Sequence, residues 1–454
     1  MTVTRPLSLS HGSLETTILI PSDSYLFYQQ LTSDFKKTLP EPTEGFANDD
    51  EPSSKSELLT KFLGYVIESN SIEAEKELAV KLILDDFETR YLQSSDIHTF
   101  ASQLLASEEY PTTLQKINSN LIKNYFAAKV YLKEDFTSSN VSSALLKAAS
   151  DDKASIFAIF GGQGNTDDYF EELREIYTTY NGLISGFLSK VRSKMQELIS
   201  STSDIDRVYT DGFDFINWLK NPSQTPSTDN LLSIPVSCPL ICVIQLCHYI
   251  ITCKTLGVTP GQFKSCLKGT TGHSQGLVTS LVVASADSWE SFDVEALKAV
   301  ELLFYLSVRC LQAYPSTSLS PSMVRDSEEN GEGKPGPMLS IRDLSVVEVE
   351  NFVNQTNQHL PSEKHIKISL INGARNVVVS GPPESLYGLN LNLRNAKAPS
   401  GLDQSRIPYS QRRLKFSSRF LPIHSPFHSN LLAPATPRIL EDFKKSGLAF
   451  DQSK

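Results

Sequence analysis

The chain has 454 residues, of which 40% are hydrophobic and 21% are charged. This is the composition of an ordinary globular protein with enough apolar side chains for a large core, and the length suggests roughly two or three domains. The formal net charge is −10 at pH 7 and no long basic run occurs, so the composition argues against a nucleic-acid partner.

The cysteines and the apolar stretches indicate a cytoplasmic protein. Six cysteines in so long a chain, without a Cys-x-x-Cys pair, do not make a disulfide framework. His248 follows Cys247, but we expect a core histidine there and no metal site. The N-terminus does not start a signal peptide. The most apolar stretch, residues 239–252, is interrupted by Gln245 and is too short to span a bilayer, so we expect no membrane association.

Residues 1–150 are expected to form a separate, mostly helical portion. Residues 14–21 alternate weakly and suggest an edge strand, and residues 40–55 are rich in Pro, Asp and Ser and suggest a loop. Apolar side chains then recur with helical spacing in four stretches, which predicts helices packed on one another. These stretches do not gather catalytic residue types, so their plainest role is structural or in assembly. They are residues 58–67, 73–92, 97–105 and 114–131.

A glycine-rich turn follows the first strongly apolar run. Residues 155–160 are β-formers typical of a buried parallel strand, and they lead directly into Gly161-Gly162-Gln163-Gly164. A polar turn with Asp167 and helices at 169–180 and 183–200 come next. Such a turn directs backbone N–H groups at one point, for a phosphate or for an oxyanion. The P-loop Lys-Ser/Thr and the Gly-x-Gly-x-x-Gly spacing are both missing, which favours an oxyanion hole.

The stretch Gly272-His273-Ser274-Gln275-Gly276 has the Gly-x-Ser-x-Gly form of a nucleophile elbow. An apolar helix at 238–256 and a strand at 264–271 are predicted before it. The residues after Gly276 favour a helix, whose N-terminus would supply amide donors and a favourable dipole where negative charge develops. Ser274 is therefore the expected nucleophile. The structural alternative is a serine that caps a glycine-flanked core helix.

A helix at 289–314 and a polar, glycine-rich mobile loop at 320–337 are predicted after the elbow. Residues 337–423 then read as strand, helix, strand, strand, helix, strand, the split βαβ order of a ferredoxin-like domain. We expect this domain to be an insert between two parts of an α/β core, residues 151–336 and 424–454. The predicted strands are 338–341, 365–371, 376–380 and 414–423, with helices at 346–358 and 384–395.

A serine hydroxyl needs a base, and eight histidines are available. His273 adjoins the nucleophile, so its side chain should point away along the strand. His424 and His428 lie in a Pro-bounded turn, and His428 is favoured because it opens what looks like the next helix, within reach of Ser274. The histidines in segments with no other chemistry are His11, His98, His359 and His365.

Three motifs carry a family resemblance. Gly162-Gln163-Gly164, Gly272-His273-Ser274-Gln275-Gly276 and Phe427-His428-Ser429, in this order around a ferredoxin-like insert, resemble the acyl-CoA:acyl-carrier-protein acyltransferase family. Residues 41–52, 160–173 and 398–408 are similar to the N-terminal acetyltransferase region of fungal fatty acid synthase β chains, and this match covers essentially the whole chain. The resemblance implies an acyltransferase-type α/β fold with a parallel-sheet, α/β-hydrolase-like core.

The resemblance also implies roles for four residues. Ser274 would carry the acyl group as an ester, His428 would be its base, and the backbone amides of Gln163 and Gln275 would form the oxyanion hole. Acetyl-CoA would load Ser274, and the phosphopantetheine thiol of acyl carrier protein would collect the acetyl group, with no bound cofactor. In this family a backbone carbonyl orients the histidine. The other implied partners are the synthase α subunit and the remainder of the β chain, in a large hetero-oligomer.

One position is expected to set the substrate. Malonyl-transferring relatives place an arginine in a Phe-Tyr-Arg-Gly-like context to pair the malonyl carboxylate. Here Phe304-Tyr305-Leu306-Ser307 puts Leu306 in that position, so a malonyl carboxylate would lack a counter-charge and acetyl is favoured. Arg309 lies one helical turn away on nearly the same face, and the argument would fail if it reached the pocket.

Two other functions stay open at this point. A serine hydrolase of the α/β-hydrolase kind shares the elbow, but it needs an Asp or Glu that orients His428. Alternatively, the chain is a non-catalytic assembly fragment of the synthase, acting through residues 1–150. The family's fold normally continues well past the catalytic histidine, and this chain stops at Lys454. We therefore expect a fragment that lacks the C-terminal part of its core and exposes a strand edge.

Overall fold

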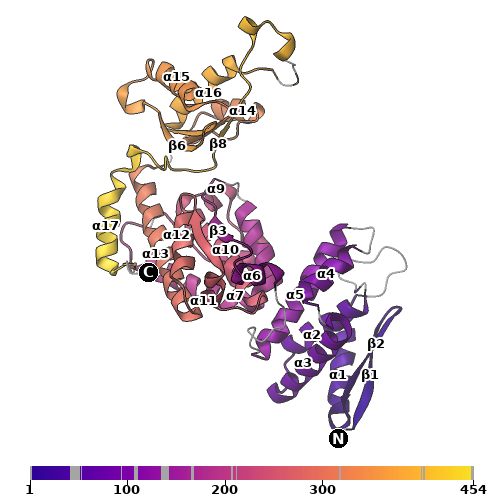
Figure 1. The fold of residues 1–454 in the computed structure, drawn as a ribbon. Coiled ribbons are helices and arrows are strands. Elements are labelled where there is room, and N and C mark those ends of the chain that lie inside the picture. The colour runs from indigo at the N-terminus through magenta and orange to yellow at the C-terminus, as the bar shows by residue number, and fades with distance from the viewer. Residues whose placement is uncertain are drawn as a thin grey trace. The chain divides into compact units, whose positions relative to one another are not determined.

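The computed structural model describes residues 3–40, 52, 54–93, 95–106, 111–133, 143–164, 168–205, 208–210, 212–315, 319–399, 401 and 404–450. Most of the predicted loop at 40–55, the polar turn with Asp167 and parts of the 398–408 motif lie outside these residues. The chain divides into two compact units, whose elements are labelled in Figure 1. The first comprises Met1–Ile156, Leu173–Ser189 and Cys247–Lys268, and the second comprises Phe157–Glu172, Lys190–Leu246 and Gly269–Lys454.

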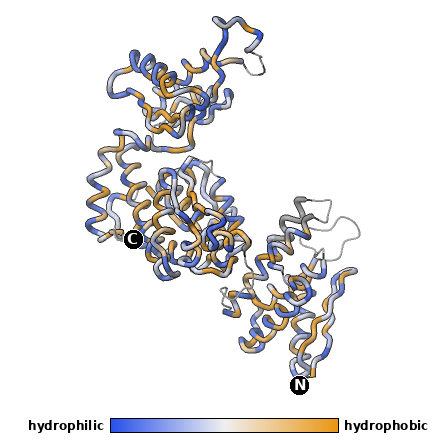
Figure 2. The backbone as a smooth tube through the Cα atoms, in the orientation of Figure 1, coloured by the Kyte–Doolittle hydropathy of each residue, from blue (hydrophilic) through white to orange (hydrophobic). Residues whose placement is uncertain are grey.

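The first unit begins with an antiparallel hairpin of β1 (Thr4–His11) and β2 (Leu14–Pro21). The strand predicted at 14–21 is present, but its partner β1 was not predicted. Both colours of the hydropathy scale occur along this hairpin (Figure 2). Because side chains alternate between the two faces, one face of the hairpin can be buried while the other meets water. The buried side chains are Leu7, Leu9, Ile18 and Ile20.

Helices make up the rest of this N-terminal portion, and the four predicted helices are confirmed. They are α2 (Lys55–Glu68), α3 (Glu73–Phe87), α4 (Ile97–Ala106) and α5 (Pro111–Tyr131). The Ser54 side chain accepts a hydrogen bond from the Glu57 amide and so caps α2. The helices α1 (Tyr25–Lys36) and α6 (Ala144–Ser150) and the π-helical turn at Glu88–Leu92 were not predicted.

The α/β core of the second unit is built on β3 (Ile156–Phe160), which is hydrogen-bonded to β4 (Leu267–Gly272). The prediction of a fully buried strand at β3 is wrong, because Phe157 is 59% exposed and Ile159 is 74% exposed. Successive side chains of a strand point to opposite faces, and the face that carries these two is not covered by the described residues.

The helices around these strands follow the predicted order with shifted ends; parts of α7 and α10 and all of α11 belong to the first unit. α7 (Asp168–Ser201) joins the two predicted helices across a kink at Tyr180, and a short helix, α11, precedes β4 where strand was expected. α10 is long and apolar enough to cross a membrane, although 78% of its most apolar window is buried, as in the core helix of a soluble protein. The helices are α8 (Phe215–Lys220), α9 (Thr228–Leu231), α10 (Ile234–Thr255), α11 (Pro260–Ser265), α12 (Gly276–Ser285) and α13 (Trp289–Ala313).

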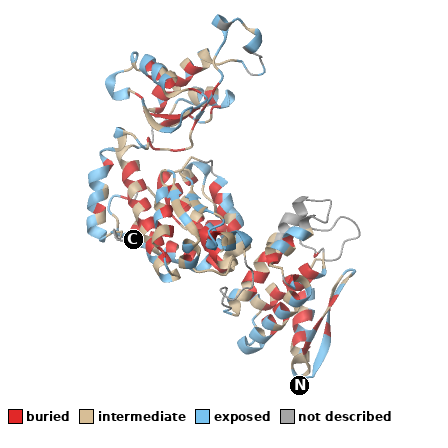
Figure 3. Cartoon of the chain, viewed as in Figure 1, coloured by how far each residue is buried: buried red, intermediate tan, exposed pale blue. Residues whose placement is uncertain are grey.

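The last helix, α17 (Ala435–Ser446), packs against α13. Figure 3 shows α13 buried along most of its length, whereas much of α17 is exposed. Only Ala435 and Asp442 of α17 are buried. An amphipathic helix of this kind is held by one narrow stripe, so each contact on that stripe contributes strongly to its docking.

The small domain has the predicted ferredoxin-like topology. Its sheet has the order β6-β7-β5-β8 with antiparallel neighbours, and two helices, α15 and α16, pack against one face. That face buries Leu339, Ile341, Val377 and Phe420 in an apolar cluster. The elements are β5 (Met338–Arg342), α15 (Val346–Asn357), β6 (Lys367–Gly373), β7 (Asn376–Ser380), α16 (Pro383–Ala396) and β8 (Ser417–Phe420).

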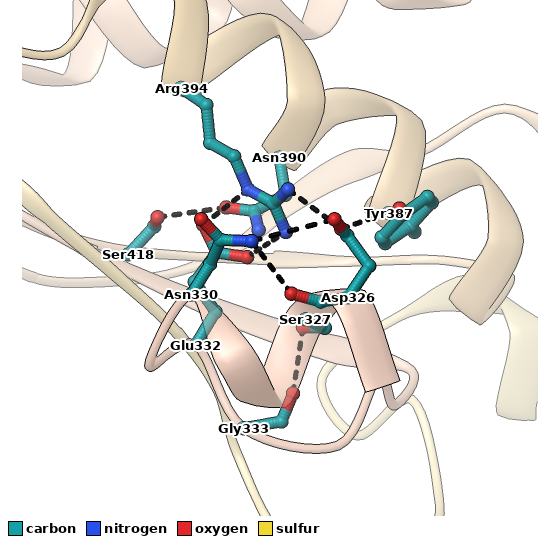
Figure 4. A network of polar contacts seen from close by, with 9 residues as sticks. All are labelled: Asp326, Ser327, Asn330, Glu332, Gly333, Tyr387, Asn390, Arg394 and Ser418. Carbon is teal, nitrogen blue, oxygen red and sulfur yellow. Dashed lines mark hydrogen bonds and ion pairs between the residues drawn. The ribbon is translucent and has the colours of Figure 1, made fainter. Parts of the chain in front are cut away.

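The segment that leads into the small domain is ordered, contrary to the predicted mobile loop at 320–337. It contains α14 (Pro321–Glu329), with proline in its first turn. Figure 4 shows why the segment is fixed: the Arg394 guanidinium donates to Glu332 Oε1 at 2.7 Å and to Asp326 Oδ2 at 2.7 Å. The hydroxyl of Tyr387 donates to the same Asp326 oxygen. The partners lie more than sixty positions apart, so local composition could not reveal them.

Candidate active site

The elbow has the strand–turn–helix geometry that its sequence predicts. Ser274 lies between β4 and α12 with φ +52°, a left-handed conformation that is strained for a residue with a side chain. Only glycine fits on either side of it. A Cβ on Gly272 would lie 2.0 Å from the carbonyl carbon of Gly276, and a Cβ on Gly276 would lie 2.3 Å from the Phe160 oxygen.

The structure brings Ser274 and His428 together although they are 154 positions apart: Ser274 Oγ lies 2.8 Å from His428 Nε2. His428 also has a left-handed backbone, with φ +59°. It lies in a turn, not at the start of a helix as expected. Ser429 holds this turn, because its hydroxyl donates to the Pro426 carbonyl and accepts from the Leu431 amide.

The surroundings of His428 favour the neutral imidazole. Burial lowers its pKa below the ordinary value, and the nearby His273 charge lowers the pKa further. A neutral imidazole within hydrogen-bond reach can take the proton of Ser274. No carboxylate among the described residues hydrogen-bonds to His428, so Ser274 and His428 form a dyad there, without the acidic third member of a hydrolase triad.

Gln163 and Gln275 line the same cavity as Ser274, and their side chains are turned into the protein. Gln163 Nε2 donates to Ser237 Oγ at 2.6 Å, and Gln275 Nε2 donates to the Cys238 carbonyl at 2.8 Å. Neither backbone N–H has an acceptor in the part of the chain that the structure describes. Two fixed amides without protein partners, next to the nucleophile, are suited to stabilise an oxyanion.

The cavity at Ser274 has a volume of about 510 Å³. The α/β core contributes apolar side chains from α13 to the cavity wall, and the small domain contributes polar side chains. Leu306 lies in its wall and Arg309 does not. The core contributes Leu303 and Leu306 to the wall, and the small domain contributes Ser340, Arg342, Asn372 and Asn376.

Arg309 is held away from this cavity by Asp442 of α17. Its Nε and Nη2 donate to the two carboxylate oxygens at 2.6 and 2.9 Å, and its Nη1 donates to Gln312. Both members of the pair are buried, and the hydrogen bonds to Asp442 raise the pKa of Arg309. This bidentate pair uses the donor fork that a malonyl carboxylate would need.

Replacing Asp442 with asparagine should lower the free energy of unfolding by about 3–5 kcal/mol, because it leaves a buried guanidinium without its counter-charge. Urea denaturation followed by circular dichroism measures the loss. The control is Glu441→Gln on the exposed side of the same helix, whose ion pair with Lys445 is solvated; this variant should unfold like the unmodified chain. Equal stability of the two variants would contradict the role given to Asp442.

Two other histidines were weighed as bases for Ser274. The prediction that His273 points away from the site is wrong: it lines the cavity, and its Nε2 lies 2.9 Å from Asn372 Oδ1 of β6. His424 lines a neighbouring cavity, where burial lowers its pKa. Asn372 and Arg342 were not singled out from the sequence. For Arg342, the sequence did contain a signal: side chains alternate along the strand at residues 338–342, which places Ser340 and Arg342 on the same face.

Comparisons with known proteins agree with the resemblance. The sequence model for "starter unit:ACP transacylase in aflatoxin biosynthesis" matches residues 158–413, and the model for the N-terminal domain in fatty acid synthase subunit beta matches residues 3–132. Fatty acid synthase subunit beta of Saccharomyces cerevisiae is 55% identical over 99% of this chain and 22% of its own length. The Schizosaccharomyces pombe subunit is 36% identical over 99% of this chain and 21% of its own length. This chain thus spans about a fifth of these relatives.

Among solved structures, MCAT from Streptococcus pneumoniae aligns with a TM-score of 0.40 and 16% identity, covering 65% of this chain and 71% of that chain. The family assignment rests on the sequence models. Since the first of them covers more than half of the 454 residues, the chain belongs to the starter unit:ACP transacylase family, in the form found in the N-terminal region of fungal fatty acid synthase β subunits.

Proposed function

We propose that this chain moves an acetyl group from acetyl-CoA, through an ester on Ser274, to the phosphopantetheine thiol of acyl carrier protein, and so primes fatty acid synthesis. The single observation that carries the proposal is the 2.8 Å contact between Ser274 Oγ and His428 Nε2, beside two backbone amides that have no acceptor among the described residues. The family supports acyl transfer to a carrier protein, and the relatives support the setting in fatty acid synthesis.

In the first half-reaction, neutral His428 accepts the proton of Ser274 while Oγ attacks the thioester carbonyl carbon. The amides of Gln163 and Gln275 stabilise the negative oxygen that forms. When the tetrahedral intermediate collapses, the C–S bond breaks, and the His428 imidazolium returns the proton to the departing CoA thiolate. In the second half, His428 takes the proton of the carrier thiol, the sulfur attacks the ester carbonyl, and Ser274 leaves and regains its proton.

The same proposal includes the partners and the compartment. The chain would work in the cytoplasm with the remainder of the β chain and with the synthase α subunit, and it would hold no bound cofactor. The similarity to β subunits of the synthase supports the partners in this proposal.

Transfer to a thiol is the test. The chain is loaded with acetyl-CoA carrying a radioactive acetyl group, freed of excess donor, and mixed with holo acyl carrier protein or with water alone. Label on the carrier's thiol, with a slow release of acetate in water, is the expected result. Rapid acetate release that the carrier does not suppress would instead favour a serine hydrolase.

Acetyl is favoured over malonyl because Leu306 lies in the wall of the cavity while Arg309 is bound to Asp442. A malonyl carboxylate packed against Leu306 would be desolvated, and α13 contributes only the apolar Leu303 and Leu306 to this wall, so it offers no counter-charge there. We expect Leu306→Arg to raise the rate of malonyl labelling from malonyl-CoA by about 100-fold, since it supplies the missing partner. Intact-mass kinetics with both donors measure this change.

The matched control is Leu306→Met, which keeps the apolar wall and nearly the same volume, so it should keep the preference for acetyl. Equal labelling of the unmodified chain by malonyl-CoA and acetyl-CoA would contradict the role of Leu306. That result would leave the nucleophile and base untouched and concern the substrate alone.

A further inference from the structure

A second cavity of about 800 Å³ adjoins the one at Ser274. The two cavities share five wall residues, so they lie side by side, and Ser274 lines the smaller one. The glycine turn, β5 and the segment after β8 contribute the shared wall. The shared residues are Gly164, Ser340, Arg342, Leu421 and Ile423.

The wall of the second cavity carries a net positive charge. Its cations are Lys334, Arg342, Lys397 and Arg419, and its only carboxylate among the described residues is Asp229. Asp229 pairs with Lys334 at 2.9 Å, which leaves three cations without a counter-charge. This excess occurs in a chain with a net charge of −10, so it is a local property of the cavity.

The two arginines lie next to each other on the open face of the small-domain sheet. Arg342 of β5 is opposite Ser417 of β8, and Arg419 of β8 is opposite Ser340 of β5. The residues between them face the apolar cluster under α15 and α16, so both guanidinium groups project from the other face. Diagonal neighbours in an antiparallel pair are close enough for long side chains to reach one ligand.

Neither arginine forms an ion pair within the described part of the chain. Two acidic side chains of the segment before β5 are instead paired with Arg394. Glu332 is buried, and both of its carboxylate oxygens bind Arg394 (Figure 4). Asp326 binds the same guanidinium. The segment that carries Lys334 is thereby fixed, and Glu332 is turned away from the cavity's cations. Arg342 and Arg419 keep their donors free for a ligand.

We propose that Arg342 and Arg419 bind the phosphate at the far end of the pantetheine arm while the thioester lies at Ser274. This inference rests on the proposed function, because it takes a pantetheine thioester as the ligand. Arginine pairs phosphate oxygens bidentately, and a positive cleft in an acidic protein attracts an anionic ligand. The phosphate can belong to CoA or to the phosphopantetheine of a carrier protein.

Removing both guanidinium groups should weaken CoA binding without affecting the chemistry. The variant Arg342→Gln/Arg419→Gln is compared with the unmodified chain, and calorimetry measures the dissociation constant of CoA itself. We expect a rise of about 10–100-fold, since charge-assisted hydrogen bonds to phosphate are lost. The matched control is Arg325→Gln on the exposed side of α14, which lies in neither cavity wall and should bind CoA as before.

The kinetics of Ser274 acylation test the contribution of the phosphate separately from that of the acyl group. With acetyl-CoA the double variant should show a raised KM, and with acetyl-pantetheine, which has no phosphate, it should match the unmodified chain. Phosphopantetheine and pantetheine as acceptors then distinguish the carrier's phosphate from that of CoA. A defect confined to the donor step assigns the site to CoA, and a defect in both steps assigns it to both ligands.

Unchanged CoA affinity in the double variant overturns the proposal. So does a variant that loses selectivity between acetyl and malonyl labelling with its KM for acetyl-CoA unchanged, because Arg342 would then act on the acyl group. Failure of the proposed function gives a different result: neither donor labels Ser274 in the unmodified chain, while calorimetry still reports whether the arginines bind CoA.

Discussion

Replacing Ser274 with alanine is expected to abolish the acetyl adduct that forms when the chain is incubated with acetyl-CoA. The hydroxyl is the only group of the elbow that can form the ester, and loss of a serine nucleophile costs about 10⁶-fold in hydrolases of the same logic. Intact-mass spectrometry reads the adduct directly. Because alanine keeps a Cβ at the same strained backbone position, the fold should be retained.

Ser322→Ala is the control, since this serine lies on exposed α14 and in neither cavity wall. It should be labelled at the normal rate. An adduct of normal yield on the Ser274 variant, mapped by peptide digestion to another side chain, would remove the basis for the nucleophile and for the reaction built on it.

Replacing His428 with alanine should slow labelling by about 10²–10⁴-fold, the range for loss of a general base. Some reaction should remain, because the two amides and the hydroxyl are still in place. His359→Ala is the control, as this exposed histidine is not near the site. A variant at His428 that labels as fast as the control would contradict the role of the imidazole.

The pH dependence of the labelling rate is a second, independent test of His428 as the base. The neutral form is the base, and the folded environment holds its pKa below the ordinary 6.5. The labelling rate should therefore be nearly constant from pH 7 to 8 and fall about tenfold per pH unit below the depressed pKa, as protonation removes the base. A midpoint above 6.5, or no decrease at low pH, would argue against this assignment.

The parts of the site that the sequence predicted are those set by local sterics. A glycine on each side of Ser274 is required by contacts of 2.0 and 2.3 Å, and a strand before and a helix after the turn follow from the apolar pattern around it. The order of strands and helices in the ferredoxin-like domain was also predicted, because apolar residues recur there with the spacing of a strand or of a helix. Eliminating the other histidines left His424 and His428, and His428 was preferred for a helix start that the structure does not show.

The parts that were missed depend on contacts between distant segments. α14 is fixed by Arg394, and Arg309 is neutralised by Asp442, 133 positions away. His273 was expected to point outward, but Asn372 of the small domain binds it. The exposure of Phe157 and Ile159 depends on what covers β3, which an apolar run alone does not reveal.

The left-handed turn at Ser274 also limits which nucleophile the site can use. Threonine carries the same hydroxyl, but its branched Cβ is strongly disfavoured at φ +52°. Serine and cysteine have an unbranched Cβ and suit this backbone better. The shape of the elbow therefore disfavours threonine as the nucleophile, before any question of reactivity arises.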